Sequence, residues 1–350
     1  MTLLAFLRHL GFCALLAAIS AMMVRAMISA LVMDTPDPRK AHARPTPKGG
    51  GVGVVVAFLL GISVLYGTAT FSRLADPYFR GVILASAAIA LVAFIDDVRD
   101  WPFTVKLGAQ ILAALVAVGS GLYVSVYRLP HIGAVDLGWL GIPLTVGWIL
   151  FATNAMNFID GLNGLAAGTT LVAAAFLAFI AQQQGGWFVY FASLLLAAGL
   201  AGFLPFNFPR ARIFMGDVGS QFCGFVLAVL GVAAARFGAI DMSFLLVPML
   251  LSGVLFDVAF TLLRRLFSGE SLTKPHRGHL YQVAQRAGVD ARYVAMLHWA
   301  FAALGGLAAI GFSHVPTVAK PVIPLLLLIP QFIWLGYVVA RARSADIGRW

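Results

Sequence analysis

The sequence predicts an all-α protein of the polytopic membrane class, a bundle of about eleven transmembrane helices forming one domain over residues 1–350. Three observations carry this prediction. Hydrophobic residues make up 61% of the chain and charged residues 11%, which excludes a soluble globular domain. Apolar runs of about 20 residues, the length that crosses a bilayer, recur along the chain. The 36 glycines allow helices to pack closely in lipid.

The predicted spans follow one another with short polar or Gly- and Pro-containing connections. In chain order they are 10–33, 49–67, 80–95 (a short one), 105–124, 139–158, 163–183, 187–206, 218–236, 243–263, 293–312 and 321–340. Lys and Arg are unequally distributed, with 17 of 24 in segments 34–48, 96–106, 207–217, 264–292 and 341–349. Because cytoplasmic loops carry the excess of basic residues, we expect the N-terminus outside and the C-terminus in the cytoplasm.

The acidic residues share one membrane face on this topology. Eleven of the 14 lie at the cytoplasmic face: Asp34, Asp37, Asp96, Asp97, Asp100, Asp160, Asp217, Asp257, Glu270, Asp290 and Asp346. Acids at the ends of apolar spans are costly and usually functional. Mixed with Lys, Arg, His and Asn, they predict an active site for a charged, metal-bound substrate. The net charge of +10 indicates basic loops beside anionic lipid, so the bilayer and not nucleic acid is the expected partner.

The first basic loop, residues 34–51, combines four prolines with three closing glycines. Its Lys and Arg side chains, among them Lys48, are suited to phosphate, and the glycines permit close approach of a ligand to the backbone. The alternative is a loop that only anchors the chain at the membrane surface.

Asp96 and Asp97 end the third span. Neighbouring residues on a helix point about 100° apart, so we expect them to have different partners. Carboxylate oxygens suit Mg²⁺, which often shares phosphate oxygens with its substrate. The alternative is a solvated helix end. Lys106 follows at the start of the next span, as a charge partner or an interface anchor.

A third motif ends the fifth span, and a fourth opens the eighth. Asn154, Asn157 and Asp160 are spaced to share one helical face, with Asn163 just beyond, and such groups in a membrane need polar partners. They either build a site or join helices by hydrogen bonds.

Asp217 stands between glycines where a helix begins, a place that favours anions and where the acid is suited to hold a metal against a bound phosphate. The alternative is a simple N-terminal charge.

The last motif lies between the ninth and tenth spans. His276, Arg277 and His279 follow Lys274, and this basic group suits phosphate better than Zn²⁺, because few acids and no cysteine lie nearby. A plain surface loop is the alternative. Asp257 lies seven residues before Arg264 on one helical face, and either a structural ion pair or a catalytic role fits it.

These motifs, in this order over residues 34–281, resemble the polyprenyl-phosphate N-acetylhexosamine-1-phosphate transferase superfamily, glycosyltransferase family 4. The resemblance implies that N-acetylhexosamine 1-phosphate passes from a UDP-N-acetylhexosamine to polyprenyl (undecaprenyl) phosphate at the inner face of a bacterial inner membrane, with release of UMP. It implies Asp217 and Asn157 as ligands of Mg²⁺, with Mn²⁺ as the substitute, and Asp96 and Asp97 as the catalytic pair. The expected substrate-binding residues are Lys48, Lys106, Asn154, Asp160, Asn163, His276, Arg277 and His279.

Two features distinguish branches of this superfamily. Asn163 stands where the branch that uses a muramoyl-pentapeptide carries Asp, and the late loop lacks that branch's run of adjacent histidines. The loop is more similar to the branch that starts O-antigen with N-acetylfucosamine or N-acetylquinovosamine phosphate.

Direct attack by the lipid phosphate is expected, with an aspartyl-phosphate route as the alternative. A transporter with an acidic ion site at the cytoplasmic side is the rival function, and a homodimer is a further expectation.

Overall fold

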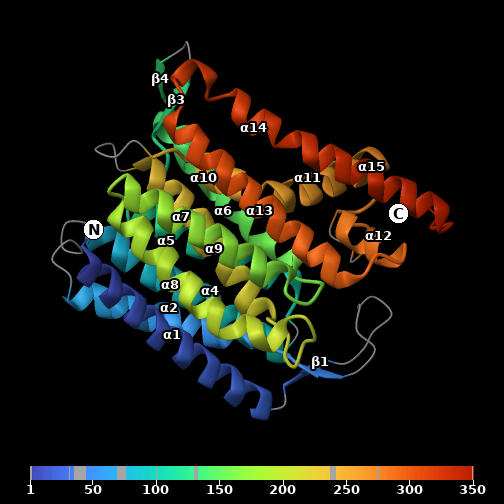
Figure 1. Ribbon diagram of the computed structural model, residues 1–350, viewed down its shortest axis with the longest axis horizontal. Coiled ribbons are helices and arrows are strands. Elements are labelled where there is room, and N and C mark those ends of the chain that lie inside the picture. The colour runs from blue at the N-terminus through green and yellow to red at the C-terminus, as the bar shows by residue number, and fades with distance from the viewer. Residues whose placement is uncertain are drawn as a thin grey trace.

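The computed structural model describes residues 2–30, 32–34, 45–68, 76–99, 101–129, 133–236, 242–272, 274, 276–348 and 350, and over these residues the chain is predominantly helical (Figure 1). The long helices are α1 Leu3–Ala30, α2 Gly51–Thr68, α4 Asp76–Arg99, α5 Phe103–Gly119, α6 Gly141–Ile159, α7 Leu165–Gln183, α8 Trp187–Asn207, α9 Asp217–Arg236, α11 Ser252–Phe267, α13 Ala291–His314 and α15 Leu328–Ser344. Residues 35–44 of the first basic loop and Asp100 lie outside the described residues.

Short elements connect these helices. They are the helices α10 Leu246–Leu250, α12 Leu280–Arg286 and α14 Val322–Leu326 and the 3-10 turns η1 Gly138–Leu140 and η2 Thr317–Ala319. Strand β1 (Met33–Asp34) pairs antiparallel with β2 (Thr46–Pro47), and β3 (Val126–Leu129) with β4 (Gly133–Asp136). The expected all-α fold thus carries two small antiparallel pairs in its loops.

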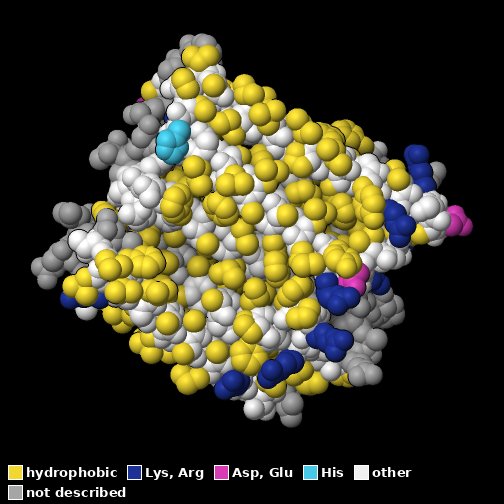
Figure 2. Space-filling view, in the orientation of Figure 1, with side chains coloured by type: hydrophobic (Ala, Val, Ile, Leu, Met, Phe, Trp, Pro, Cys, Tyr) yellow, Lys and Arg dark blue, Asp and Glu magenta, His cyan; other side chains and the backbone are white. Residues whose placement is uncertain are grey.

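Helix α9 is the centre of the bundle. In the apolar stretch of α9 that is long enough to cross a membrane, 94% of the residues are buried, and α2, α4, α6, α8 and α10 pack around the helix. The first helix and the last helical segment, Thr317–Ser344, are mostly exposed on the outside of the bundle, and only 22% of the residues in the apolar stretch of each are buried. Hydrophobic side chains accordingly cover most of the face in Figure 2, as expected where a helix bundle meets lipid tails.

Nine helices among the described residues are long and apolar enough to cross a membrane, and they match nine of the eleven predicted spans. The predicted span 105–124 is shorter, because α5 ends before Gly121, whose φ of +97° turns the chain away. The predicted span 243–263 is interrupted at Leu251, where α10 ends and α11 begins. The third span, expected to be short, is the 24-residue helix α4. Eleven crossings therefore remain a prediction.

The two ends of the bundle differ in character. In Figure 1 the chain's N-terminus and the β3–β4 pair lie toward one end, and β1, α12 and the C-terminus toward the other. Lys and Arg side chains gather along the second end in Figure 2. This separation is the one expected of a positive-inside protein. Which end faces the cytoplasm stays a prediction.

Candidate active site

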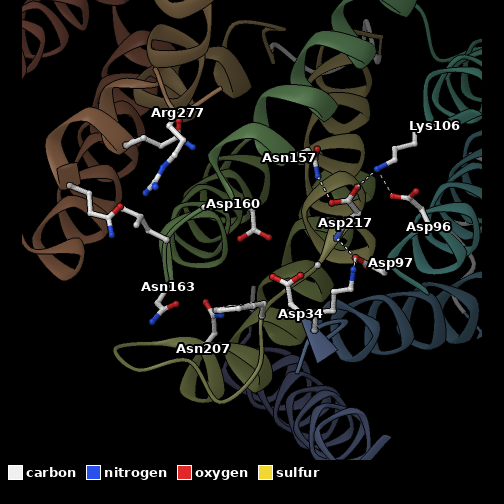
Figure 3. Close-up of a pocket in the computed structure, with 17 residues that line it drawn as sticks. Asp34, Asp96, Asp97, Lys106, Asn157, Asp160, Asn163, Asn207, Asp217 and Arg277 are labelled. Atoms are coloured by element: carbon white, nitrogen blue, oxygen red, sulfur yellow. Dashed lines mark hydrogen bonds and ion pairs between the residues drawn. The ribbon is translucent and has the colours of Figure 1, made fainter. Parts of the chain in front are cut away.

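A polar pocket of about 340 Å³ lies where the loops after α1, α6 and α8 meet the end of α4 and the starts of α5 and α9, with α12 on the far side (Figure 3). Nine of the twelve predicted site residues line it: Lys48, Asp96, Asp97, Lys106, Asn157, Asp160, Asn163, Asp217 and Arg277. The other lining residues are Asp34, Gly161, Leu162, Asn207, Phe214, Gly216, Gln282 and Gln285. Asn154, His276 and His279 do not line it. The fold therefore brings motifs from all five segments of the sequence together.

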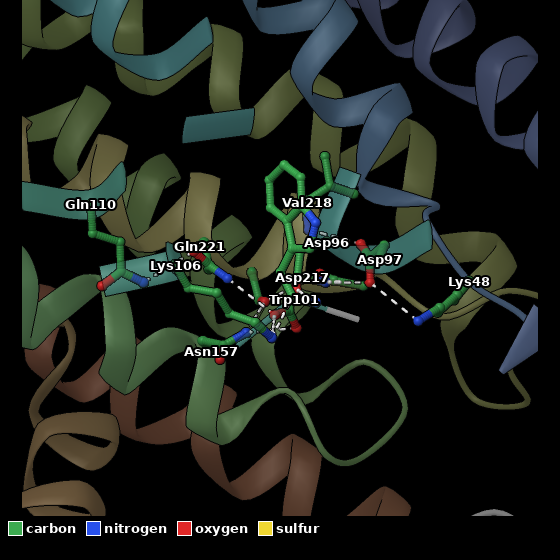
Figure 4. Close-up of polar contacts among 12 residues, drawn as sticks. Lys48, Asp96, Asp97, Trp101, Lys106, Gln110, Asn157, Asp217, Val218 and Gln221 are labelled. Atoms are coloured by element: carbon green, nitrogen blue, oxygen red, sulfur yellow. Dashed lines mark hydrogen bonds and ion pairs between the residues drawn. The ribbon is translucent and has the colours of Figure 1, made fainter. Parts of the chain in front are cut away.

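The Asp217 carboxylate contacts three side chains of the pocket region (Figure 4). Its Oδ1 accepts a hydrogen bond from Asn157 Nδ2 at 3.0 Å. Its Oδ2 accepts from Gln221 Nε2 at 3.1 Å and pairs with Lys106 Nζ at 3.3 Å. Gly216, with a φ of +75°, makes the turn that starts α9 at Asp217. The carboxylate is thus held in one orientation by side chains from three helices.

Asp97 caps the start of α9 from the neighbouring helix α4. Its Oδ1 accepts from the Asp217 backbone N–H at 3.2 Å and its Oδ2 from that of Val218 at 3.0 Å. Lys48 Nζ lies 3.7 Å from Asp97 Oδ1. A β-carbon on Gly216 would stand 2.6 Å from Asp97 Oδ2, so only glycine admits this cap. Asp97 therefore satisfies helix N–H groups that have no partner within their own helix.

Asp96 turns to a different set of partners. Its Oδ2 lies 2.5 Å from Lys106 Nζ, and its Oδ1 accepts from the Trp101 backbone N–H at 2.8 Å. The prediction that Asp96 and Asp97 have different partners is confirmed; their catalytic role stays a prediction. Lys106 bridges Asp96 and Asp217, so two helices of the pocket are joined through one ammonium group.

The end of α6 forms another wall of the pocket. Asn157 donates to Ser220 Oγ at 3.0 Å as well as to Asp217, and Asp160 is the residue at which the helix ends. Burial, followed by the negative charges of Asp217 and Asp97, raises the pKa of Asp160 to about 8. Near neutral pH its carboxyl is therefore mainly protonated.

The turn after Asp160 is fixed by Asn207, a residue that sequence reasoning missed. Asn207 Oδ1 accepts from the Gly164 backbone N–H at 2.6 Å, and its Nδ2 donates to the Ile213 carbonyl at 2.9 Å. One buried amide thus joins the turn that carries Asn163 to the loop before α9. A lone Asn next to a Phe–Pro sequence gives no signal of this contact, which depends on two distant loops.

The first basic loop docks onto the loop before α9 through its backbone. Phe214 N–H donates to the Pro47 carbonyl at 2.8 Å, and Gly51 N–H to that of Met215 at 2.8 Å. A β-carbon on Gly51 would lie 2.2 Å from the Gly219 α-carbon. Gly51 was expected to admit a ligand; the structure instead uses it for close contact between α2 and α9. The contact fixes Lys48 beside Asp97.

Asp257 organises the late histidine loop. This carboxylate, 1% exposed, accepts from the backbone N–H groups of Leu280 and Tyr281 at 3.0 Å each and pairs with His279 Nδ1 at 3.0 Å. Of the two readings left open for Asp257, these contacts support the structural one, with His279 as the side-chain partner in place of Arg264. Tyr281 in turn donates its hydroxyl to the Phe158 carbonyl at 2.9 Å, which fastens α12 to the end of α6.

His276 and His279 stack with ring centroids 5.0 Å apart, outside the pocket lining. Burial, followed by the charges of His279, Arg265 and Arg264, lowers the pKa of His276 to about 4, so its ring is neutral at pH 7. Among the described residues no three His, Cys, Asp or Glu side chains form a metal-binding group, and the Zn²⁺ alternative here lacks a third ligand. A contact of either histidine with substrate stays a prediction.

Arg277 does reach the pocket, and in Figure 3 it lies across from Asp217 and Lys106. Two glutamines of α12, Gln282 and Gln285, line the same side and were also missed. The signal for them is their spacing: residues 282 and 285 alternate with the buried positions 280, 281, 283 and 284. The short helix α12, anchored by Asp257, thus presents two amides to the pocket, and Arg277 in the loop before it presents a cation.

The residues present fit a hard divalent cation. Asn157 uses its amide nitrogen on Asp217 and Ser220, which turns its amide oxygen away from both. Carboxylate and amide oxygens suit Mg²⁺, which is commonly bound by one or two carboxylates plus substrate phosphates. A third protein ligand is therefore not required. Three carboxyl groups, those of Asp96, Asp97 and Asp217, share only two lysine partners, Lys48 and Lys106.

The fold and the pocket define a polytopic membrane protein with a polar site at one end. Residues 79–235 match the family described as Glycosyl transferase family 4. A decaprenyl-phosphate N-acetylglucosaminephosphotransferase of Mycobacterium tuberculosis is 34% identical, over 89% of this chain and 85% of its own. A probable undecaprenyl-phosphate N-acetylglucosaminyl 1-phosphate transferase of Bacillus subtilis is 29% identical, over 82% and 78%. A phospho-N-acetylmuramoyl-pentapeptide-transferase of Acetivibrio thermocellus is 33% identical, over 60% and 66%.

The chain therefore belongs to glycosyl transferase family 4. The superfamily predicted from the motifs is confirmed at this level. The N-acetylfucosamine or N-acetylquinovosamine branch stays a prediction.

Proposed function

We propose that this protein transfers N-acetylhexosamine 1-phosphate from a UDP-sugar to polyprenyl phosphate and releases UMP. The observation that carries the proposal is the meeting of Asp96, Asp97, Asn157 and Asp217 with Lys48 and Lys106 in one pocket at a single end of the bundle. Transfers of this type between polyprenyl phosphate and a sugar phosphate are named for relatives that align over most of the chain.

The donor diphosphate requires positive charge and a fixed orientation. Lys48 and Lys106 on one side and Arg277 on the other are placed to offset its charge. Asp217 and Asn157 would hold Mg²⁺, which supplies charge neutralisation on the diphosphate when bound. Gln282 and Gln285 offer amide groups to the neutral parts of the donor, its sugar or its base.

The acceptor needs little activation, because a phosphate monoester with a second pKa near about 6 is mostly dianionic at neutral pH. In the direct route, an oxygen of the lipid phosphate attacks the phosphorus that carries the sugar. The bond from that phosphorus to the oxygen bridging to UMP breaks, and UMP leaves. Asp96 orients the lipid phosphate or accepts its remaining proton, with Lys106 beside it. Catalysis then rests on positioning and charge, as in other phosphoryl transfers.

The alternative passes through an aspartyl-phosphate. It predicts that sugar phosphate or phosphate labelled in the donor becomes bound to the protein when no lipid acceptor is present. The direct route predicts no such adduct, and its trapping would overturn that route.

The proposal is tested by incubating the purified chain with polyprenyl phosphate, Mg²⁺ and UDP-sugars and measuring UMP. We expect release that depends on the lipid, loss of release in Asp217→Asn, and normal release in Asp290→Asn, an acid at the exposed start of α13. A transporter would release no UMP. Near-normal turnover in Asp217→Asn would contradict the role of that residue.

The donor and the pathway are finer proposals. The late loop favours the branch that uses N-acetylfucosamine or N-acetylquinovosamine phosphate in O-antigen synthesis, whereas the printed names of two relatives give N-acetylglucosamine. A panel of UDP-sugars in the same assay separates these donors. A bacterial inner membrane and a homodimer complete the proposal, and each is checked by cell fractionation and by the mass of the purified particle.

A further inference from the structure

Beneath the pocket floor lies a buried row of amide side chains that the proposed chemistry does not use. Gln221 donates to Asp217 Oδ2 at 3.1 Å, and its own Oε1 accepts from Gln110 Nε2 at 3.0 Å. Gln110 Oε1 accepts from Asn154 Nδ2 at 2.7 Å. Gln110 and Gln221 are each 3% exposed. Figure 4 shows the two glutamines leading from α5 and α9 toward Asp217.

We propose that Gln221, supported by Gln110 and Asn154, is a positioning residue that fixes the Asp217 carboxylate for a divalent cation. This rests on the proposed function, in which Asp217 holds the metal. Asn154, expected to bind substrate, would act instead at the far end of this row.

The direction of the hydrogen bonds carries the inference. A carboxylate accepts hydrogen bonds only, so Gln221 must present its NH₂ group and not its oxygen to Asp217. The Gln110 NH₂ group favours this orientation, because it donates to the Gln221 oxygen at 3.0 Å and to Asn154 Oδ1 only at the longer distance of 3.4 Å. Asn154 fixes Gln110 in the same way, and Asn154 itself donates to the Leu150 carbonyl at 2.8 Å. A helix backbone thus sets the orientation of three successive amides, and the last sets the carboxylate.

Burial gives this arrangement its effect. The bond between Gln110 and Gln221 is buried from water, so breaking it leaves a buried polar group unsatisfied. Groups that hold a metal ligand in place typically change metal affinity by about 10–100-fold when they are removed. The amides also join α5, α6 and α9, the helices that carry Lys106, Asn157 and Asp217.

The test measures Mn²⁺ binding directly, by the loss of the free-ion electron paramagnetic resonance signal on titration of the chelator-treated full chain in detergent. We expect Gln221→Met, which keeps the length of the side chain, to weaken Mn²⁺ binding by about 10–100-fold. Gln110→Met, which does not touch Asp217, should weaken it less, and the double variant should match Gln221→Met because the two act in series. Thr153→Val is the matched control, since its buried hydroxyl has no hydrogen-bond partner among the described residues.

Mn²⁺ affinity within twofold of the wild type in Gln221→Met, or an equal loss in Thr153→Val, would overturn the positioning role. If Gln221→Met does not fold, Gln110→Met carries the test, and unchanged affinity there overturns the chain of amides. Measurement of UMP release by the wild type tests the proposed function independently of Mn²⁺ binding. If the wild type releases UMP and both glutamine variants bind Mn²⁺ normally, the proposed function stands and the positioning role is wrong. If the wild type binds no Mn²⁺, both the metal site and the positioning role are wrong.

Discussion

The replacement Asp257→Ala tests whether the late loop is positioned by a buried carboxylate or whether that carboxylate takes part in chemistry. Asp257 accepts two backbone N–H groups at 3.0 Å and pairs with His279, itself 4% exposed. Without the carboxylate, all three donors are left buried without this acceptor. Leaving a buried donor without an acceptor costs about 1–3 kcal/mol for each donor, because the donor keeps its desolvation penalty. On the scaling for globular domains of 150–250 residues, each kcal/mol lost lowers the melting temperature by roughly 2–4 °C.

The assay pairs thermal unfolding in detergent with UMP release at a temperature well below both transitions. We expect Asp257→Ala to unfold earlier and to show a raised KM for the UDP-sugar, since Arg277, Gln282 and Gln285 lose their anchor, while kcat falls less. Asp290→Ala is the matched control, because Asp290 also accepts from the start of a helix, at Arg292 N–H, but is exposed. Its transition should move much less, since water replaces the lost acceptor. An unchanged melting temperature with a large loss of kcat in Asp257→Ala would refute the structural reading.

Three further predictions follow from particular contacts. Gly51→Ala should sharply reduce UMP release and destabilise the chain by about 1–3 kcal/mol, measured by thermal unfolding, because its β-carbon would meet the backbone of Gly219 at 2.2 Å; Gly67→Ala, where a β-carbon meets nothing, should change neither. Asp160→Asn should stabilise the metal-free chain at pH 8 and not at pH 4: a carboxyl whose folded pKa is raised to about 8 contributes stability below its unfolded pKa of 3.8 and loses it as the pH rises through 8. Equal melting temperatures of Asp160→Asn and wild type at both pH values would contradict this. Chelation with EDTA should abolish UMP release and added Mg²⁺ should restore it; full activity in EDTA would remove the metal from the proposal.

Much of the site could be predicted from the sequence, because charged residues in membrane spans are costly and rare, and those present usually have a function. Asp96, Asp97, Asn157 and Asp217 stood out against apolar spans, and all four line one pocket. Helix positions followed from apolar run length. The break at Leu251 was missed because hydropathy does not register a change in backbone hydrogen bonding.

Contacts between distant segments were beyond such reading. Asn154 and Asn157 share a sequence motif, yet one lies in the buried amide row and the other in the pocket, a difference that depends on where α5 crosses α6. His279 looked like a phosphate ligand from its basic neighbours, and only the fold shows its ring beside Asp257. Polar residues inside a helix bundle form hydrogen bonds with one another, and sequence spacing alone does not predict which residues become partners.

The start of α9 shows how one such contact alters the chemistry. Helix N-termini favour anions, so a substrate phosphate could be expected to sit on the free N–H groups there. Asp97 already accepts from the first two, those of Asp217 and Val218. The N-terminus therefore stabilises the protein's own carboxylates, and the diphosphate must be held by other charges in the pocket. Lys48 pairs with Asp97, and Lys106 with Asp96 and Asp217, so both cations stand beside the acids that repel the substrate. Under the proposed function, a dianionic donor and an anionic acceptor would be held together in this pocket by a further cation shared between them.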